Sequence, residues 1–306
     1  MARPPEFDEL RRKVRNWGRW GEDDELGTLN LITDEVVRRG AASVRTGKRF
    51  SLAVPLSEDG PQTGAIEGRV NPQRTMVAVN RPLGRAGPDF SDDAVTMGLQ
   101  AATHWDALAH VSFEGRIYNG FPASAVDETG ATRCGIDHVR TLAGVGVLLD
   151  VARAHGLERL DHGHAIGRED LDESERSAGI TVEPGDIVLV RTGQMRLLRE
   201  GDRRRYAHPS PGLGMESALW FRERDVAAVA TDNLTLEVYP PERDDCPFPL
   251  HILHLVDMGL TQGQNWDLEA LAEDCAADGR FEFLLEASPE PFVRGLGSPV
   301  NPVAIK

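Results

Sequence analysis

The densest group of side chains that could perform chemistry lies between Gln100 and His110, where the sequence reads QAATHWDALAH. His104, Asp106 and His110 place two imidazoles and one carboxylate close together in the chain. In an extended segment His104 and Asp106 point to one side, and in a helical turn Asp106 and His110 do so. A neutral imidazole and a carboxylate can bind a divalent cation if two or three further ligands come from elsewhere. The alternative is a surface His and Asp beside a buried aromatic residue.

A divalent cation in this group would support hydrolysis. It lowers the pKa of water from about 15.7 toward about 7 and polarises a carbonyl group. A histidine with a pKa near about 6.5 can take the proton from that water and return it to the leaving group. Cleavage of a formamide, lactam or lactone fits these groups. Intramolecular carbon–carbon cyclisation fits them too, with the cation stabilising an enolate.

Other residues have both a functional and a structural interpretation. Trp105 lies between the candidate ligands and could line a substrate cavity. His208 lies in a loop rich in Pro and Gly, which either covers a pocket or is a plain surface loop. Glu237 follows a buried strand end, where sites in α/β sheets gather, but is equally a capping or salt-bridge carboxylate. His162 and His164 form an HxH pair that we interpret as part of a surface loop.

The elements that would position these residues are clearest in the second half of the chain. Short aliphatic runs predict strands that are covered on both faces, at 146–151, 186–191 and 226–231. Helical patterns lie between them at 167–177 and 214–224, and a helix over 265–277 precedes a strand at 281–287.

The first half alternates short elements with long polar stretches. The patterns predict helices at 7–14 and from Asp34 onward, and strands at 50–56 and 75–79. The stretches 57–74 and 80–94, rich in Gly, Pro, Asp and Arg, predict long loops. Together these elements predict an α/β fold with a mixed sheet in a single domain over 1–306, with an N-terminal arm over about residues 1–48.

Composition excludes several classes of protein. The 306 residues are 40% hydrophobic and carry a formal net charge of −15, which argues against disorder, a fibre and a nucleic-acid groove. No apolar run reaches the roughly 18 to 20 residues that cross a bilayer, so we expect no membrane partner. The first residues lack the apolar segment of a secretory signal, and three scattered cysteines are typical of reduced thiols. We therefore expect a cytoplasmic enzyme.

The segment from Gln100 to His110 resembles the HxGTHxDxPxH signature of the metal-dependent cyclase family, which includes bacterial kynurenine formamidases and isatin hydrolase-like enzymes. The resemblance continues, in order, over WGRWGEDDELGTLNLIT near the N-terminus, GVLLDVAR at 146–153, EPGDIVLVRTG at 183–193, ATDNLTLE at 230–237 and PLHILHLVDMGL at 249–260. Because these segments span most of the chain, it is identified as a member of this family.

The resemblance implies a swivelling β/β/α fold, a homodimer or homotetramer, and a Zn²⁺ or Mn²⁺ centre that hydrolyses a small amide or ester. By position, His104 and Asp106 correspond to metal ligands of the signature. His110 corresponds to the histidine that such enzymes use for proton transfer. His251 matches a downstream histidine that lies near the metals in formamidases.

The chain departs from the family pattern at two ligand positions. Gln100 replaces the first histidine of the signature, and Gln264 replaces a glutamate that helps to hold a second metal in formamidases. A neutral amide oxygen binds transition metals weakly, so we predict one ion, near His104, Asp106 and His251. Ligation by Gln100 and Gln264 would shift the preference toward Mn²⁺ or Mg²⁺ over Zn²⁺. A metal-free, degenerate site is the alternative.

We therefore expect a metal-dependent hydrolase of a small cyclic or aromatic amide or ester. The alternatives are a cyclase or lyase that acts on a secondary-metabolite intermediate of polyketide type, and a catalytically silent ligand-binding homologue. Hydrolysis and cyclisation need the same cation and base, so both stay open at this point.

Overall fold

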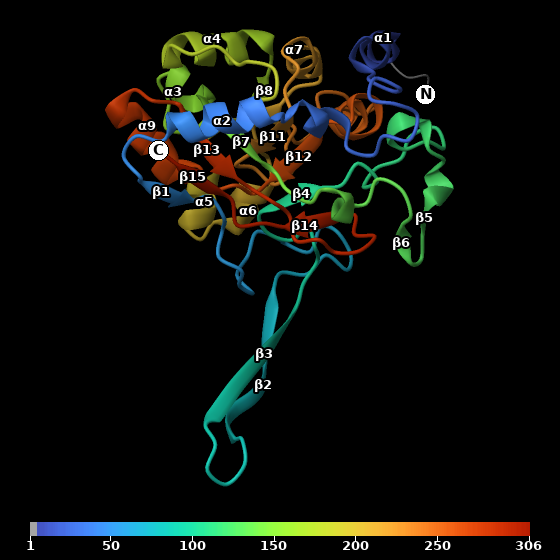
Figure 1. Ribbon diagram of the computed structural model, residues 1–306. Helices are drawn as coiled ribbons and strands as arrows, with labels where there is room; N and C mark the ends of the chain where they lie inside the picture. Colours follow the sequence, from blue (N-terminus) through green and yellow to red (C-terminus); the bar gives the residue numbers. More distant parts are fainter. Residues whose placement is uncertain (1–4) are drawn as a thin grey trace.

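A mixed β-sheet forms the centre of the protein in the computed structural model, which describes residues 5–306 (Figure 1). In spatial order its strands are β1 (Arg49–Ser51), β15 (Val303–Ile305), β13 (Glu282–Glu286), β7 (Ala143–Asp150), β9 (Ile187–Arg191), β11 (Ala228–Thr231), β12 (Thr261–Gln264), β4 (His104–Asp106) and β14 (Gly297–Pro299). The strands β7, β9, β11 and β12 run parallel, and the other pairs are antiparallel. The predicted α/β fold with a mixed sheet is confirmed.

The parallel strands are buried on both faces, as their unbroken aliphatic runs predict. Alternate residues of these strands face two separate hydrophobic cores. Val147 and Val188 belong to one core, whereas Leu148 and Leu189 belong to the other. Strand β7 ends at Asp150, one residue before the end of the predicted run. The Asp150 side chain accepts a backbone hydrogen bond there and thereby caps helix α3.

Helices pack around this sheet (Figure 1). Their bounds are α1 (Pro5–Val14), α2 (Asp34–Ser43), α3 (Val151–Ala154), α4 (Arg168–Ala178), α5 (Met195–Arg199), α6 (Arg203–Ala207), α7 (Ser217–Glu223), α8 (Pro249–His251), which continues as a π-helix (Ile252–Met258), and α9 (Glu269–Asp278). Short 3₁₀ helices span Gly27–Leu31, Tyr118–Gly120, Ala123–Ala125 and Ile136–His138. Helix α2 packs closely on β7 and β13. Glycine at position 40 permits this approach, because a Cβ there would lie only 2.8 Å from the carbonyl of Gly144.

The predicted loop at 80–94 is wrong, because residues 80–82 and 89–94 belong to two strands. Strands β2 (Gln73–Pro82) and β3 (Asp89–Thr96) form a long antiparallel hairpin that stands away from the body of the protein (Figure 1). The Asp-rich sequence of β3 hid the strand, since both faces of the hairpin are largely exposed and show no alternation of apolar and polar residues.

Two further differences from the predicted elements lie beside the sheet. The predicted strand at 50–56 is short, because Pro55 has no N–H for a ladder and Ala53 forms only an isolated bridge. Small two-stranded sheets pair β8 (Ala165–Ile166) with β10 (Gly212–Leu213) and β5 (Val126–Asp127) with β6 (Gly130–Ala131). Among the described residues, no helix has the length and apolar character to cross a bilayer.

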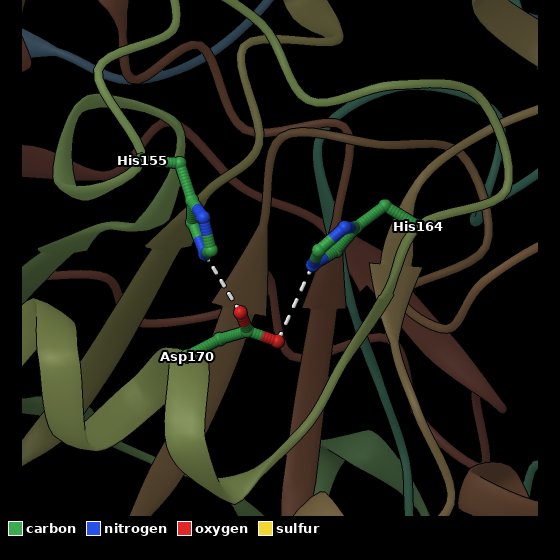
Figure 2. Close-up of side chains that lie close together, drawn as sticks. All are labelled: His155, His164 and Asp170. Carbon is green, nitrogen blue, oxygen red and sulfur yellow. Dashed lines mark hydrogen bonds and ion pairs between the residues drawn. The ribbon is translucent and has the colours of Figure 1, made fainter.

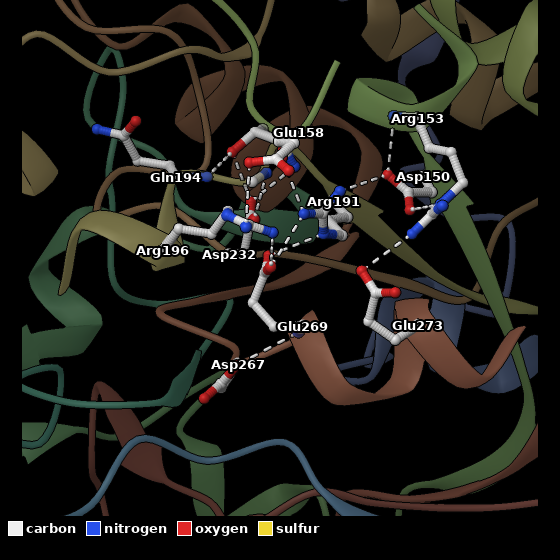
Figure 3. A network of polar contacts seen from close by, with 12 residues as sticks. Asp150, Arg153, Glu158, Arg191, Gln194, Arg196, Asp232, Asp267, Glu269 and Glu273 are labelled. Atoms are coloured by element: carbon white, nitrogen blue, oxygen red, sulfur yellow. Dashed lines mark hydrogen bonds and ion pairs between the residues drawn. The ribbon is translucent and has the colours of Figure 1, made fainter. Parts of the chain in front are cut away.

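A buried ion-pair network ties the ends of the parallel strands to α9 (Figure 3). Arg191, at the end of β9, donates to Asp150 Oδ1 at 2.8 Å and to Glu269 Oε1 at 2.8 Å. Burial by itself lowers the pKa of the Arg191 guanidinium, but Glu269 and Asp150 raise it above its usual value. The ion pairs of Arg191 therefore connect β7, β9 and α9.

We expect Arg191→Ala to lower the free energy of unfolding by about 3 kcal/mol, because two buried carboxylates lose their buried cation and keep only the partly exposed Arg153 and Arg196. Arg38→Ala is the matched control, since Arg38 pairs with Glu35 on the exposed surface of α2. That change should cost less than about 1 kcal/mol. Urea denaturation of both variants measures the difference, and equal losses would contradict the assignment.

Candidate active site

His104 and Asp106 project from the same face of the short strand β4. Their Nε2 and Oδ1 atoms lie 3.4 Å apart, and both side chains are 1% exposed. Strand β4 is paired with β12 on one side and with β14 on the other, so that His104 lies opposite Gln264 and Asp106 lies opposite Gly297. The extended geometry predicted for the two residues is therefore present.

Trp105 lies between these residues in the sequence but faces the core. Its ring contacts Trp266, with centroids 4.8 Å apart, and its Nε1 donates to the Ala287 carbonyl at 2.8 Å. The side chain is fully buried among apolar residues. Neighbouring residues of a strand point to opposite faces, so Trp105 packs the core and does not line a cavity with His104 and Asp106, contrary to expectation.

The atoms of His104 and Asp106 that face each other fit a divalent cation. The Nδ1 of His104 lies 2.7 Å from the Ala102 carbonyl, which requires the proton on Nδ1 and leaves a lone pair on Nε2. His104 Nε2 and Asp106 Oδ1 are buried without a hydrogen-bond partner among the described residues. A buried polar atom without a partner is costly, and a metal ion would satisfy both atoms at once.

The second oxygen of Asp106 is held by two glutamines of β12. Gln264 Nε2 donates to Asp106 Oδ2 at 2.8 Å, and Gln262 Nε2 donates to it at 3.2 Å. An amide nitrogen cannot ligate a metal, so this geometry gives Gln264 a positioning role in place of the expected ligand role. Gln262 was not anticipated, although residues two apart on a strand share a face and the TQGQ run would have indicated it.

Gln100 lies close to β4 and is half-buried. Its amide nitrogen would lie 2.7 Å from a Cβ on Gly297, the strand partner of Asp106. Within residues 5–306 no hydrogen bond joins its side chain to His104 or Asp106. A ligand role for Gln100 therefore stays a prediction.

His110 follows β4 in a turn and not in a helix, with its N–H bonded to the Ala107 carbonyl at 2.9 Å. The turn nevertheless brings His110 Nε2 to 3.8 Å from Asp106 Oδ1. Burial lowers the pKa of His110, and the positive charges of His251 and Arg69 act in the same direction, against the opposing effect of Asp106. His110 is therefore a neutral imidazole at pH 7.

His251 is oriented by Glu237. Its Nδ1 is hydrogen-bonded to Glu237 Oε1, and the same carboxylate accepts the N–H of Leu250 at 3.1 Å and that of His251 at 3.3 Å. Burial by itself lowers the pKa of His251, but the hydrogen bond to Glu237 and the charges of Glu237 and Asp106 together raise it above its usual value. Glu237 thus caps α8 and holds a histidine, which is the structural alternative to the substrate-binding role expected from the sequence.

His208 lies at the outer end of a row of rings that leads to His251. Its ring centroid is 5.1 Å from that of Tyr239, which stacks on Phe248 at 5.9 Å. The Phe248 ring lies in turn 5.6 Å from the ring of His251. His208 is exposed, and Phe248 is 40% exposed, so the row reaches from the surface to the site.

Comparison with known proteins identifies the family. A family model described as "Putative cyclase" matches residues 50–238. The crystal structure of a novel cyclase is 37% identical and superposes with a TM-score of 0.89, covering 97% of this chain and 99% of that chain. The chain belongs to the cyclase family. The predicted membership and the cyclase-like fold are both confirmed.

More distant solved structures share the cyclase fold alone. Isatin hydrolase A from Labrenzia aggregata, bound to benzyl benzoate, has a TM-score of 0.64 at 19% identity and covers 86% of this chain and 94% of that chain. A potential metal-dependent hydrolase with cyclase activity has a TM-score of 0.51 at 16% identity and covers 84% of this chain and 96% of that chain. No curated protein matches this cyclase-family chain.

We expect His104→Ala to abolish Mn²⁺ binding at this cyclase-family site, because the variant lacks one of the two unpartnered ligand atoms. Gln262→Ala should weaken the affinity about 10- to 100-fold, since it removes a hydrogen bond that orients the ligand. His138→Ala, which changes a partly exposed histidine beside Glu25, is the control. Elemental analysis after Mn²⁺ loading and gel filtration measures the metal. Full Mn²⁺ content in His104→Ala would refute the ligand assignment.

Proposed function

We propose that this cyclase-family protein is a metal-dependent hydrolase of a small cyclic or aromatic amide or ester. The observation that carries the proposal is the pair of buried, unpartnered atoms, His104 Nε2 and Asp106 Oδ1, which face each other. Two histidines with opposite pKa shifts lie around the same carboxylate. Pairs of titratable groups whose pKa values are moved apart are typical of acid–base catalysis.

We propose one divalent cation at His104 and Asp106, with Mn²⁺ or Zn²⁺ as the first candidates and Mg²⁺ as the third. When bound, such a cation polarises a carbonyl group and acidifies water. The glutamines support a single ion, because Gln262 and Gln264 occupy Asp106 Oδ2 and bring no negative charge for a second one. They leave Asp106 Oδ1 as the available carboxylate oxygen.

His110 is the proposed base. As a neutral imidazole close to Asp106 it can take a proton from the attacking water and pass it to the leaving group. His251 has the complementary role: Glu237 accepts its Nδ1 proton and favours the charged form, so Nε2 can donate a hydrogen bond to a substrate oxygen. The two histidines thus divide the acid and base roles.

Arg69 and the ring row support an aromatic acyl substrate. The Arg69 side chain is half-buried, and no hydrogen bond or ion pair to it is present within residues 5–306. Burial lowers the pKa of its guanidinium, and the charge of Asp106 partly offsets this effect. Hydrolysis of an amide or ester creates a carboxylate, which would pair with Arg69. The exposed face of Phe248 offers a platform for an aromatic ring.

A cyclase or lyase reaction on a small-molecule intermediate is the second candidate. The family description favours it, and the fold is shared with a potential metal-dependent hydrolase with cyclase activity. His110 would then remove a proton from carbon in place of water. Release of a carboxylate from a panel of aromatic amides, esters and lactones distinguishes hydrolysis from this reaction.

We expect His110→Ala to lower turnover by about 10²- to 10⁴-fold, the usual contribution of a positioned acid–base group. Metal content and melting temperature should stay near wild type, because His110 is not among the proposed ligands. Turnover on the amide and ester panel, metal content and melting temperature are measured on the same preparation. Retained turnover, or loss of the metal together with activity, would refute the base assignment.

We also propose that the protein is a homodimer or homotetramer in which the β2–β3 hairpin packs on a second copy. A two-stranded hairpin by itself is marginally stable in water. This one carries exposed apolar side chains: Val77 at 67%, Val79 at 64%, Leu83 at 57% and Val95 at 55%. Contact with another chain would cover these side chains and stabilise the hairpin.

We expect the double change Val77→Lys and Val79→Lys to convert the assembly to monomers, because charged side chains oppose burial in an interface. Leu157→Lys, at an exposed apolar residue outside the hairpin, is the control. Light scattering coupled to size-exclusion chromatography gives the molar mass of each protein. A monomeric wild type, or an assembly that survives the double change, would contradict the proposal.

A further inference from the structure

Three side chains of types that ligate metals converge at the protein surface, on elements other than those of the active site (Figure 2). His155 follows α3, His164 precedes β8, and Asp170 lies in the first turn of α4. The Nε2 of His155 is 2.7 Å from Asp170 Oδ1, and the Nε2 of His164 is 3.3 Å from Asp170 Oδ2. The three ligand atoms lie within 4.8 Å of one another.

Local structure holds this group in place. Asp170 Oδ2 also accepts the Gly167 N–H at 2.8 Å, which closes the first turn of α4 and fixes the carboxylate. The His155 N–H bonds to the Val151 carbonyl at 3.2 Å and extends the last turn of α3. The two imidazole rings meet edge to face, with centroids 5.5 Å apart. Both imidazoles thus come from helix or strand ends and point at one carboxylate.

We propose that His155, His164 and Asp170 form a peripheral site for a transition-metal dication, with Zn²⁺ as the preferred ion. Two imidazoles and a carboxylate are a common ligand set for Zn²⁺, whose tetrahedral ligand atoms lie about 3.3–3.6 Å apart at the usual bond lengths. The 3.3 Å between His164 and Asp170 matches that spacing, whereas the 2.7 Å between His155 and Asp170 is a hydrogen bond that a bound ion would replace. The side chains are 37%, 31% and 16% exposed, in the order of the sequence, so water can supply the fourth ligand.

This site should differ from the active site in its metal preference. It offers two nitrogen ligands, which suit Zn²⁺, Cu²⁺ and Ni²⁺, whereas Mg²⁺ and Mn²⁺ prefer oxygen. Asp170 also lines a cleft between α1 and α4, in which the acidic side chains (Glu6, Glu9, Glu169, Asp170 and Glu216) outnumber the basic ones (Lys13 and Arg168). A bound ion would join the ends of α3 and α4 to the segment before β8, and so stabilise this edge of the fold.

The test is the Zn²⁺ content of protein that has been stripped with a chelator and then dialysed against Zn²⁺. We expect the double variant His155→Gln and His164→Gln to bind one Zn²⁺ per chain fewer than the wild type. His162→Gln, in the same loop but hydrogen-bonded to the Pro209 carbonyl, should bind as much as the wild type. Asp170 is left unchanged because it caps α4. His164→Gln alone, which disturbs the surface least, should also lose this ion.

A second comparison separates this site from the active site. His104→Ala should keep the peripheral Zn²⁺, and Zn²⁺ should raise its melting temperature by several degrees, whereas the triple variant with His155→Gln and His164→Gln should show no shift. Mn²⁺ content should be equal in wild type and the double variant. Equal Zn²⁺ content in wild type and the double variant would overturn the peripheral site. Equal Zn²⁺ content in wild type and His104→Ala would instead contradict the metal centre of the proposed function.

Discussion

The buried carboxylate of Asp106 is the constraint on which the candidate active site depends. Burial by itself would raise the pKa of Asp106, but the neighbouring imidazoles of His110 and His104 outweigh burial and hold it well below its usual range. An ionised carboxylate in the interior needs compensation at each oxygen. Two amides of β12 satisfy Oδ2, and Oδ1 faces His104 without a hydrogen-bond partner among the described residues. The same charge that is costly to bury is therefore the one that can hold a cation.

The sheet keeps this arrangement separate from the parts that provide stability. The parallel strands divide their alternate side chains between two hydrophobic cores. The ion pairs of Arg191 connect the ends of β7 and β9 to α9 (Figure 3). Strand β4 takes no part in this network and lies between β12 and β14. It can therefore carry polar side chains on one face while Trp105 anchors the other face in a core.

An amide at position 264, where the resemblance implies a glutamate, changes what the cyclase fold offers to a substrate. A glutamate at position 264 would add a second buried negative charge beside Asp106, whereas Gln264 donates a hydrogen bond to it. The site then has one carboxylate facing two histidines and the nearby charge of Arg69. The positive charges of His251 and Arg69 near this carboxylate suit a reaction in which a carbonyl oxygen gains negative charge and a carboxylate is formed.

The sequence by itself determined several strands, through local periodicity, and the family, through an ordered set of motifs. The aliphatic runs were sufficient to place β7, β9 and β11, and the spacing of two predicted that His104 and Asp106 share a face, because the period of a strand is two. Tertiary structure alone decided that Gln262 and Gln264 turn their nitrogens to Asp106 and that Glu237 holds His251. These outcomes depend on strand register and on the packing of distant segments, which no local pattern encodes. The β2–β3 hairpin escaped prediction for a related reason: it has no buried face within its own chain that would impose an alternating sequence.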